Sequence, residues 1–177
     1  KAGNKIFEIN LGVEYSVSIG ADNTIYISGG KKMFAYDGLE GFKKWEFDAV
    51  VMGQEEGGAA GVFPVVIGPS ENVYFGSYAL KYRQYNKVYS INGLNGGVNW
   101  SIIPEIEITD NRFYEFDGGY PAIDFNGNII IGINNDVNAL SQNNGKKLWA
   151  SSIGKYITSP AIGADGTVYV GSSGVGK

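Results

Sequence analysis

The stretch Ala35-Tyr-Asp-Gly-Leu-Glu-Gly41-Phe-Lys-Lys-Trp45 decides the fold, because the same frame occurs again at residues 90–100 and 139–149. In each copy a small residue opens the frame, a glycine follows six positions later and a tryptophan ten positions later. All 3 tryptophans of the chain close one of these frames. A residue as large as tryptophan, used at one position of a recurring frame, indicates an array of repeated units.

A second recurring block predicts a pair of strands joined by a tight turn. Its copies are residues 17–27, 65–75, 121–131 and 160–170. Residue pairs that tolerate the positive φ of a hairpin turn stand between the expected strands, at Asp22-Asn23, Asn126-Gly127 and Asp165-Gly166. The pair Glu71-Asn72 is the weak member of this set.

Each unit therefore predicts four short antiparallel strands, two from the block and two from the frame. A series of such units is typical of an all-β β-propeller built of four-stranded blades. We expect one array of about four repeats over residues 1–177, with a blade end at 1–12, blades at 13–49, 60–103 and 118–153, and a partial blade at 156–177. Residues 3–10 are predicted to form a strand of the tryptophan type, with Gly3 and Phe7 at the glycine and tryptophan positions. One strand is missing from a blade built of both ends, so we expect the array to be part of a larger ring.

The composition argues against several classes of function. The chain has 177 residues, a net charge of −4 and a pI near 4.8, whereas proteins that bind nucleic acid present basic surface. It contains no cysteine and no histidine, which removes disulfides, thiolate metal sites and Ser–His or Cys–His pairs. No apolar window is long enough to predict a membrane span.

The frame at residues 35–45 and the segment 159–171 resemble the pyrroloquinoline-quinone-like (quinoprotein) repeat. The resemblance implies a propeller of seven or eight blades in which Trp45, Trp100, Trp149 and, at the same position, Phe7 dock each blade on the next. Its members include quinone-dependent dehydrogenases and non-catalytic relatives, such as a lipoprotein of the outer-membrane assembly machine. It also implies an extracytoplasmic location, which is periplasmic, cell-surface or secreted.

The chain departs from the catalytic members of that family. They hold their quinone between an adjacent-cysteine disulfide and a tryptophan, and they bind calcium with Glu, Asn and Asp. This chain lacks cysteine, and its tryptophans are all assigned to the docking position. Only the first frame keeps the repeat's aspartate, as Asp37, which Asn92 and Ser141 replace in the others. We therefore expect no cofactor, with pyrroloquinoline quinone and calcium as the alternative.

Three insertions interrupt the regular spacing, at residues 48–62, 76–87 and 101–120. Since antiparallel strands alternate in direction, all three are expected to project from one face of the disc. The first and third are acidic, the second is basic, and tyrosines and phenylalanines are interleaved with the charges. The candidate binding residues are Glu55, Glu56, Tyr78, Tyr82, Arg83, Tyr85, Glu105, Glu107, Asp110, Arg112, Tyr114 and Asp117.

This mixture suits an interface with a protein or a glycan. The leading hypothesis is a non-catalytic binding or scaffold module. The alternatives are a fragment of a quinone- and calcium-dependent dehydrogenase, a structural spacer of a surface protein, and self-association of a half-ring. The loops of opposite charge could equally pair with each other.

Three local motifs each have two possible roles, one of them catalytic or ligand-binding and the other structural. Glu105 and Glu107 could act as paired carboxylates or form the solvated side of a strand. The segment Asp124-Phe-Asn126-Gly-Asn128 is similar to part of a calcium loop, but its position predicts a hairpin turn. The run at residues 57–61 is rich in glycine, and without a P-loop lysine it predicts a plain loop.

Overall fold

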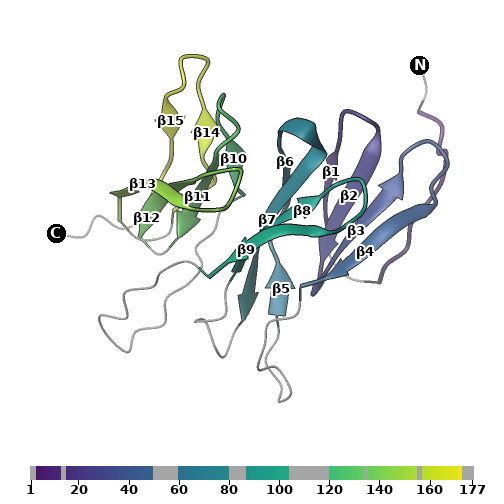
Figure 1. The fold of residues 1–177 in the computed structure, drawn as a ribbon. Helices are drawn as coiled ribbons and strands as arrows, with labels where there is room; N and C mark the ends of the chain where they lie inside the picture. Colours follow the sequence, from purple (N-terminus) through teal and green to yellow (C-terminus); the bar gives the residue numbers. More distant parts are fainter. Residues whose placement is uncertain are drawn as a thin grey trace.

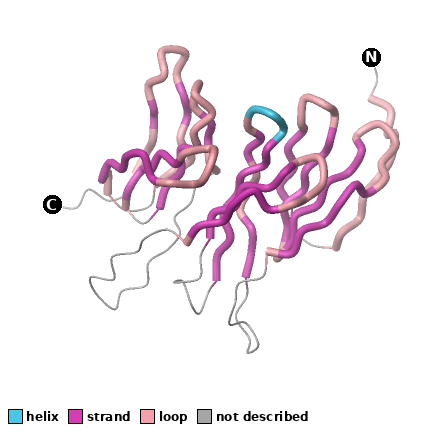
Figure 2. Tube along the Cα trace, viewed as in Figure 1, coloured by secondary structure: helices cyan, strands magenta, loops and turns pink. Residues whose placement is uncertain are grey.

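The computed structural model describes residues 3–12, 15–49, 60–79, 87–103, 120–133, 135–154 and 157–172. These residues form successive antiparallel sheets, which Figures 1 and 2 show side by side. The strands are β1 (Tyr15–Ile19), β2 (Thr24–Gly29), β3 (Lys32–Asp37), β4 (Lys43–Asp48), β5 (Ala60–Val62), β6 (Val66–Ile67), β7 (Asn72–Ala79), β8 (Lys87–Asn92), β9 (Val98–Ile102), β10 (Ala122–Ile123), β11 (Ile129–Ile133), β12 (Asp136–Leu140), β13 (Lys147–Ser152), β14 (Ala161–Ile162) and β15 (Val168–Tyr169). The helical segment in Figure 2 is the short turn η1 (Pro69–Glu71).

The sheets follow the repeat of the sequence. The first has the order β1-β2-β3-β4 and the third β10-β11-β12-β13. The second has the order β5-β7-β8-β9, with β6 also paired to β7, and the fourth consists of β14 and β15. The prediction of an all-β fold made of four-stranded antiparallel blades is confirmed.

The turns between the first two strands of each blade have the predicted backbone. Positive φ occurs at Asn23 (64°), Gly127 (81°) and Gly166 (85°). In the second blade, where the sequence signal is weak, Ser70 and Glu71 both take positive φ, at 61° and 58°. Side chains rarely adopt this conformation, so this turn bears more backbone strain than the other three.

The first strand of the second blade is split in two. β5 pairs with the far end of β7, from Ala60 opposite Ala79 to Val62 opposite Ser77, and β6 pairs with its near end. Pro64 lies in the gap, and the N–H of Phe63 donates to the carbonyl of Gly76 at 2.8 Å. Proline cannot donate to a ladder, so the strand bulges there and resumes.

The hydrophobic core lies between adjacent blades. Phe47 on β4 of the first blade packs edge-on against Phe75 and Tyr89 of the second, with ring centroids 6.0 and 5.4 Å apart. The first core cluster accordingly joins residues of both blades, including the fully buried Met33 and Val73. Two further clusters join the second blade to the third and the third to the hairpin β14–β15. Within the described residues, no helix is long and apolar enough to cross a membrane.

The segment at residues 3–11 differs from its prediction as a strand. It carries no ladder pairing among the described residues. A strand of this type needs the preceding strand of its own blade as a hydrogen-bonding partner, and no described strand occupies that position. Phe7 of this segment lies against the first blade, because a Cβ built on Gly41 would lie 3.0 Å from its ring.

Candidate functional site

The described ends of the three insertions meet at one edge of the second blade. Ala60 of β5 pairs with Ala79 of β7, which brings the end of the first insertion to the start of the second. Ser77 pairs with Lys87, and Val88 pairs with Ile102, so β8 and β9 reach the same edge. We call this edge, defined by Ala60, Ala79, Lys87 and Ile102, the insertion edge.

The insertions are shorter than the sequence predicts. Residues 60–62 form β5, and β7 continues through Gly76 to Ala79, so both segments belong to the sheet. Gly76 lies inside β7, as Gly132 lies inside β11. Three additional ladder pairs between β5 and β7 extend this blade instead. The insertions thus rise from an ordered sheet edge.

Most candidate binding residues lie outside the described residues. These are Glu55, Glu56, Tyr82, Arg83, Tyr85, Glu105, Glu107, Asp110, Arg112, Tyr114 and Asp117. Tyr78 lies in β7, in register with Gly61 of β5. Their assignment to a binding surface stays a prediction.

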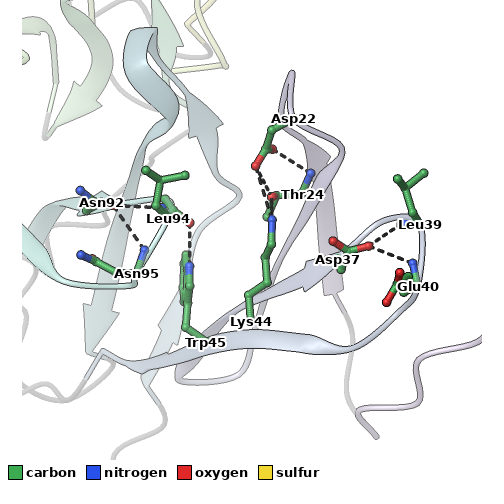
Figure 3. A network of polar contacts seen from close by, with 11 residues as sticks. Asp22, Thr24, Asp37, Leu39, Glu40, Lys44, Trp45, Asn92, Leu94 and Asn95 are labelled. Atoms are coloured by element: carbon green, nitrogen blue, oxygen red, sulfur yellow. Dashed lines mark hydrogen bonds and ion pairs between the residues drawn. The ribbon is translucent and has the colours of Figure 1, made fainter.

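The opposite edge of the blades, which we call the turn edge, is closed by tight turns (Figure 3). At residues 38–41 a carboxylate oxygen of Asp37 accepts hydrogen bonds from the N–H groups of Leu39 and Glu40, both at 2.9 Å. These two bonds hold the pKa of Asp37 below its ordinary value of 3.8. Asn92 makes the same turn through its amide oxygen, which accepts from the N–H groups of Leu94 and Asn95. The replacement of Asp37 by Asn92 and Ser141 along the chain therefore preserves an acceptor for the turn.

Tryptophan joins the first blade to the second, and the second to the third, at this same turn edge. The indole N–H of Trp45 donates to the carbonyl of Gly93 in the second blade at 2.7 Å (Figure 3). The indole N–H of Trp100 donates to the carbonyl of Gln142 in the third blade at 2.8 Å. A Cβ built on Gly96 would lie 3.0 Å from Trp45, and one on Gly145 would lie 2.7 Å from Trp100. The frame glycine is thus required because the indole of the preceding blade covers it.

A polar group between the first two blades was not predicted. Asp22 accepts hydrogen bonds from the hydroxyl and the N–H of Thr24, at 2.6 and 2.9 Å, and Lys44 lies 3.4 Å from its carboxylate. The Thr24 hydroxyl, its N–H and Lys44 together lower the pKa of Asp22. Burial, and the charges of Asp22 and Glu71, raise the pKa of Tyr26 to about 12. Asp22 and Lys44 are engaged with each other and with Thr24, whereas the Tyr26 hydroxyl and one carboxylate oxygen of Glu71 are buried without a hydrogen-bond partner.

Nothing in the described residues fits a metal centre. They contain no group of three or more acidic side chains that could hold an ion. In the segment that is similar to a calcium loop, Asp124 accepts hydrogen bonds from the N–H groups of Asn126 and Asn128, and from the Asn128 amide. Its carboxylate is therefore engaged in the hairpin turn that its position predicts.

Comparison with known proteins gives matches at the level of structure. No protein family and no curated protein sequence matches the chain. A protein of unknown function from Bacteroides caccae has 17% sequence identity and a TM-score of 0.63, over 93% of this chain and 55% of that chain. BamB from Moraxella catarrhalis has 14% identity and a TM-score of 0.60, over 88% and 43%. The quinohemoprotein alcohol dehydrogenase ADHIIG from Pseudomonas putida HK5 has 14% identity and a TM-score of 0.60, over 87% and 30%.

The class of protein follows from these observations: the chain has the β-propeller fold. Its structural neighbours include BamB and quinohemoprotein dehydrogenases, so the likeness of its repeat to quinoprotein-type propellers extends to three dimensions. At these identities the likeness concerns the fold alone. The chain spans about half the length of the first two neighbours and less than a third of the third.

Trp45 and Trp100 do not fit a quinone site. Trp45 is 8% exposed, and both Trp45 and Trp100 have their N–H groups bonded to the next blade and their rings against its glycine. Trp149 is 43% exposed. The chain lacks cysteine, so the disulfide that the resemblance assigns to a quinone sandwich is absent.

Proposed function

We propose that this propeller is a non-catalytic binding or scaffold module that contacts a protein or a glycan through the loops of its insertion edge. An extracytoplasmic location is part of the same proposal. The observation that supports it is the register of β5, β7, β8 and β9, which brings the bases of all three insertions to one edge of one blade. Binding loops are commonly gathered in this way on one side of a rigid scaffold.

The rigidity of that scaffold supports the proposal. Val73, Tyr74 and Phe75 of β7 and Val88 of β8 are all fully buried, so the strands that carry the insertions are held on both sides. The turn edge instead closes in short turns whose polar groups are engaged with each other. The long loops are therefore at the insertion edge. Their tyrosine, arginine and acidic residues would supply contact area and polar groups for recognition.

Site-specific photo-crosslinking tests the proposal. A photoreactive phenylalanine analogue is placed at Tyr82 in the second insertion and, as the matched control, at Leu94 on the turn edge, where the native side chain is 68% exposed. We expect saturable adducts with a protein partner, or binding on a glycan array, that the triple variant Tyr82→Ala, Arg83→Ala and Tyr114→Ala loses. Equal labelling from both positions, or binding that survives the triple variant, would contradict the proposal.

A thermal-shift measurement separates this proposal from the dehydrogenase alternative. A ligand that binds only the folded protein raises the melting temperature, and the rise grows with the logarithm of ligand concentration above the dissociation constant. We expect pyrroloquinoline quinone with calcium to leave the melting temperature unchanged. A rise that grows with ligand concentration would favour the enzyme and count against a purely binding role.

A further inference from the structure

Two polar atoms lie buried and without a hydrogen-bond partner between the first two blades. One is the hydroxyl of Tyr26, whose side chain is fully buried, and the other is Oε2 of Glu71. The nearby Thr24 hydroxyl is already engaged, since it donates to Asp22 and accepts from Lys44 (Figure 3). A buried hydroxyl or carboxylate that makes no hydrogen bond is costly, so both atoms need a partner.

The backbone at Glu71 makes the position of its carboxylate notable. Glu71 has a φ of 58° and is the seventh residue of the recurring block. The other three copies have Asn23, Gly127 and Gly166 there, which tolerate a positive φ better than glutamate does. Backbone strain of this kind persists where the surrounding structure compensates for it. A favourable contact of the Glu71 carboxylate with the first blade would supply that compensation.

The carboxylate of Glu71 lies beside Gly20 of the first blade, where a second carboxylate and the Tyr26 ring also lie. A Cβ built on Gly20 would be 2.5 Å from Oε2 of Glu71 and 2.9 Å from Oδ1 of Asp22. The same Cβ would be 3.2 Å from Cε2 of Tyr26, the ring carbon next to the one that carries the hydroxyl. The two carboxylates and the tyrosine thus surround a place at which the chain has no side chain.

Water has the donors and the acceptor that these three side chains require. Ionised carboxylates only accept hydrogen bonds, so Glu71 and Asp22 cannot bond to each other, and the single proton of Tyr26 can serve only one of them. A water molecule donates two hydrogen bonds, one to each carboxylate, and accepts one from the Tyr26 hydroxyl. Buried waters typically make about three hydrogen bonds to polar groups of this kind.

We propose that one water molecule is bound between the first two blades, where it accepts from Tyr26 and donates to Glu71 and Asp22. The third blade supports a role for the hydroxyl, because Ile130 stands at the tyrosine position of the block and is 1% exposed. The position can therefore be packed without a tyrosine. The water site lies at the turn edge and is independent of what the insertion edge binds.

A double-mutant cycle tests whether the hydroxyl and the carboxylate share a partner. Tyr26→Phe deletes only the hydroxyl, and Glu71→Met removes the carboxylate while keeping a side chain of similar length. In urea denaturation we expect Tyr26→Phe to raise the equilibrium constant for unfolding about tenfold in the wild type, but less than about twofold in the Glu71→Met background. The matched control is Tyr74→Phe, at the same block position but packed toward the third blade, which should be additive with Glu71→Met.

A hydroxyl without a bound water predicts a different result. Replacing an unsatisfied buried group by an apolar one of the same shape is neutral or stabilising. A Tyr26→Phe variant as stable as the wild type, or one that loses the same stability in both backgrounds, would therefore overturn the proposal.

A high-resolution crystal structure of the wild-type chain gives a direct readout that does not depend on the variants. We expect a water oxygen within hydrogen-bonding distance of Tyr26, Glu71 and Asp22. A direct hydrogen bond from Tyr26 to Glu71, a cation in that place, or no ordered density there would each overturn the proposal.

Discussion

A single side chain, the frame tryptophan, connects one blade to the next. Trp45 and Trp100 each contribute an apolar ring, which covers the following glycine, and one N–H, which satisfies a backbone carbonyl. Burying a large ring is favourable only when its polar group also finds a partner. Trp149 has the same sequence context but is 43% exposed, so it should contribute less than Trp45 to the free energy of unfolding.

Replacing the tryptophans by phenylalanine measures this difference. Trp45→Phe removes the donor to the Gly93 carbonyl in a buried contact, so we expect a loss of about 1–3 kcal/mol in the free energy of unfolding. Trp149→Phe, at a side chain that is 43% exposed, should change it by less than about 0.5 kcal/mol. Urea denaturation of the two variants provides the comparison. Equal effects would show that the hydrogen bond to Gly93 contributes nothing.

Two glycine variants separate the cost of a left-handed backbone from the cost of crowding the tryptophan ring. Gly96 has a φ of +74°, and a Cβ built on it would lie 3.0 Å from the ring of Trp45. Gly166 has a φ of +85°, and a Cβ built on it would meet only the ring of Phe125, at 4.0 Å. Both alanine variants carry the cost of left-handed backbone, about 1–2 kcal/mol. Gly96→Ala should cost about 1–3 kcal/mol more, because the added methyl overpacks the indole. Equal losses in chemical denaturation would remove the packing argument.

The stability of the first blade should fall in acid because of Asp37. Its folded pKa lies below 3.8, so its stabilising contribution is present above that ordinary value and is lost as pH falls through the folded pKa. Asn92 makes the same turn without a charge, and Asp37→Asn should therefore keep the turn while losing this part of the pH dependence. Melting temperatures at neutral pH and near pH 3 check this. A variant with the wild-type slope would assign the acid sensitivity to other groups.

At the scale of elements, the sequence predicts the strands and turns that recur in each blade, but not a strand that forms only by pairing with another. The turns at Asn23, Gly127 and Gly166 follow from residues that tolerate positive φ. β5 could not be predicted, because its residues, Ala-Gly-Val, have no strand pattern of their own and are ordered by pairing with β7. The sequence predicts where the insertion edge lies, because the alternating direction of the strands determines the edge of the blade from which each loop projects. It does not predict the conformation of the loops.

The second blade should be the most sensitive to core truncation. Phe75 is fully buried, stacks on Tyr89 at 5.3 Å and meets Phe47 of the first blade. Phe75→Ala removes contacts on both sides and should cost about 3–5 kcal/mol. Phe125→Ala, at a side chain that is 72% exposed, should stay within about 0.5 kcal/mol. Thermal or chemical unfolding distinguishes them, and a mild Phe75→Ala would mean that the blades are not coupled through this contact.

At the scale of the whole molecule, the array is quasi-linear, and stability arises from each blade and its neighbours. The second blade has a neighbour on each side, whereas the fourth sheet consists of the hairpin β14–β15 and contacts only the third. Stability is therefore expected to decrease from the middle of the chain toward its ends.

Hydrogen exchange followed by mass spectrometry should reveal this gradient. In dilute protein the β14–β15 hairpin should exchange first, because its ladder holds only the pairs Ala161–Tyr169 and Ile162–Val168 and Tyr169 is exposed. β7 and β8 should exchange last, since Val73, Tyr74, Phe75 and Val88 are fully buried. Uniform exchange across the blades would show that the array unfolds as one unit.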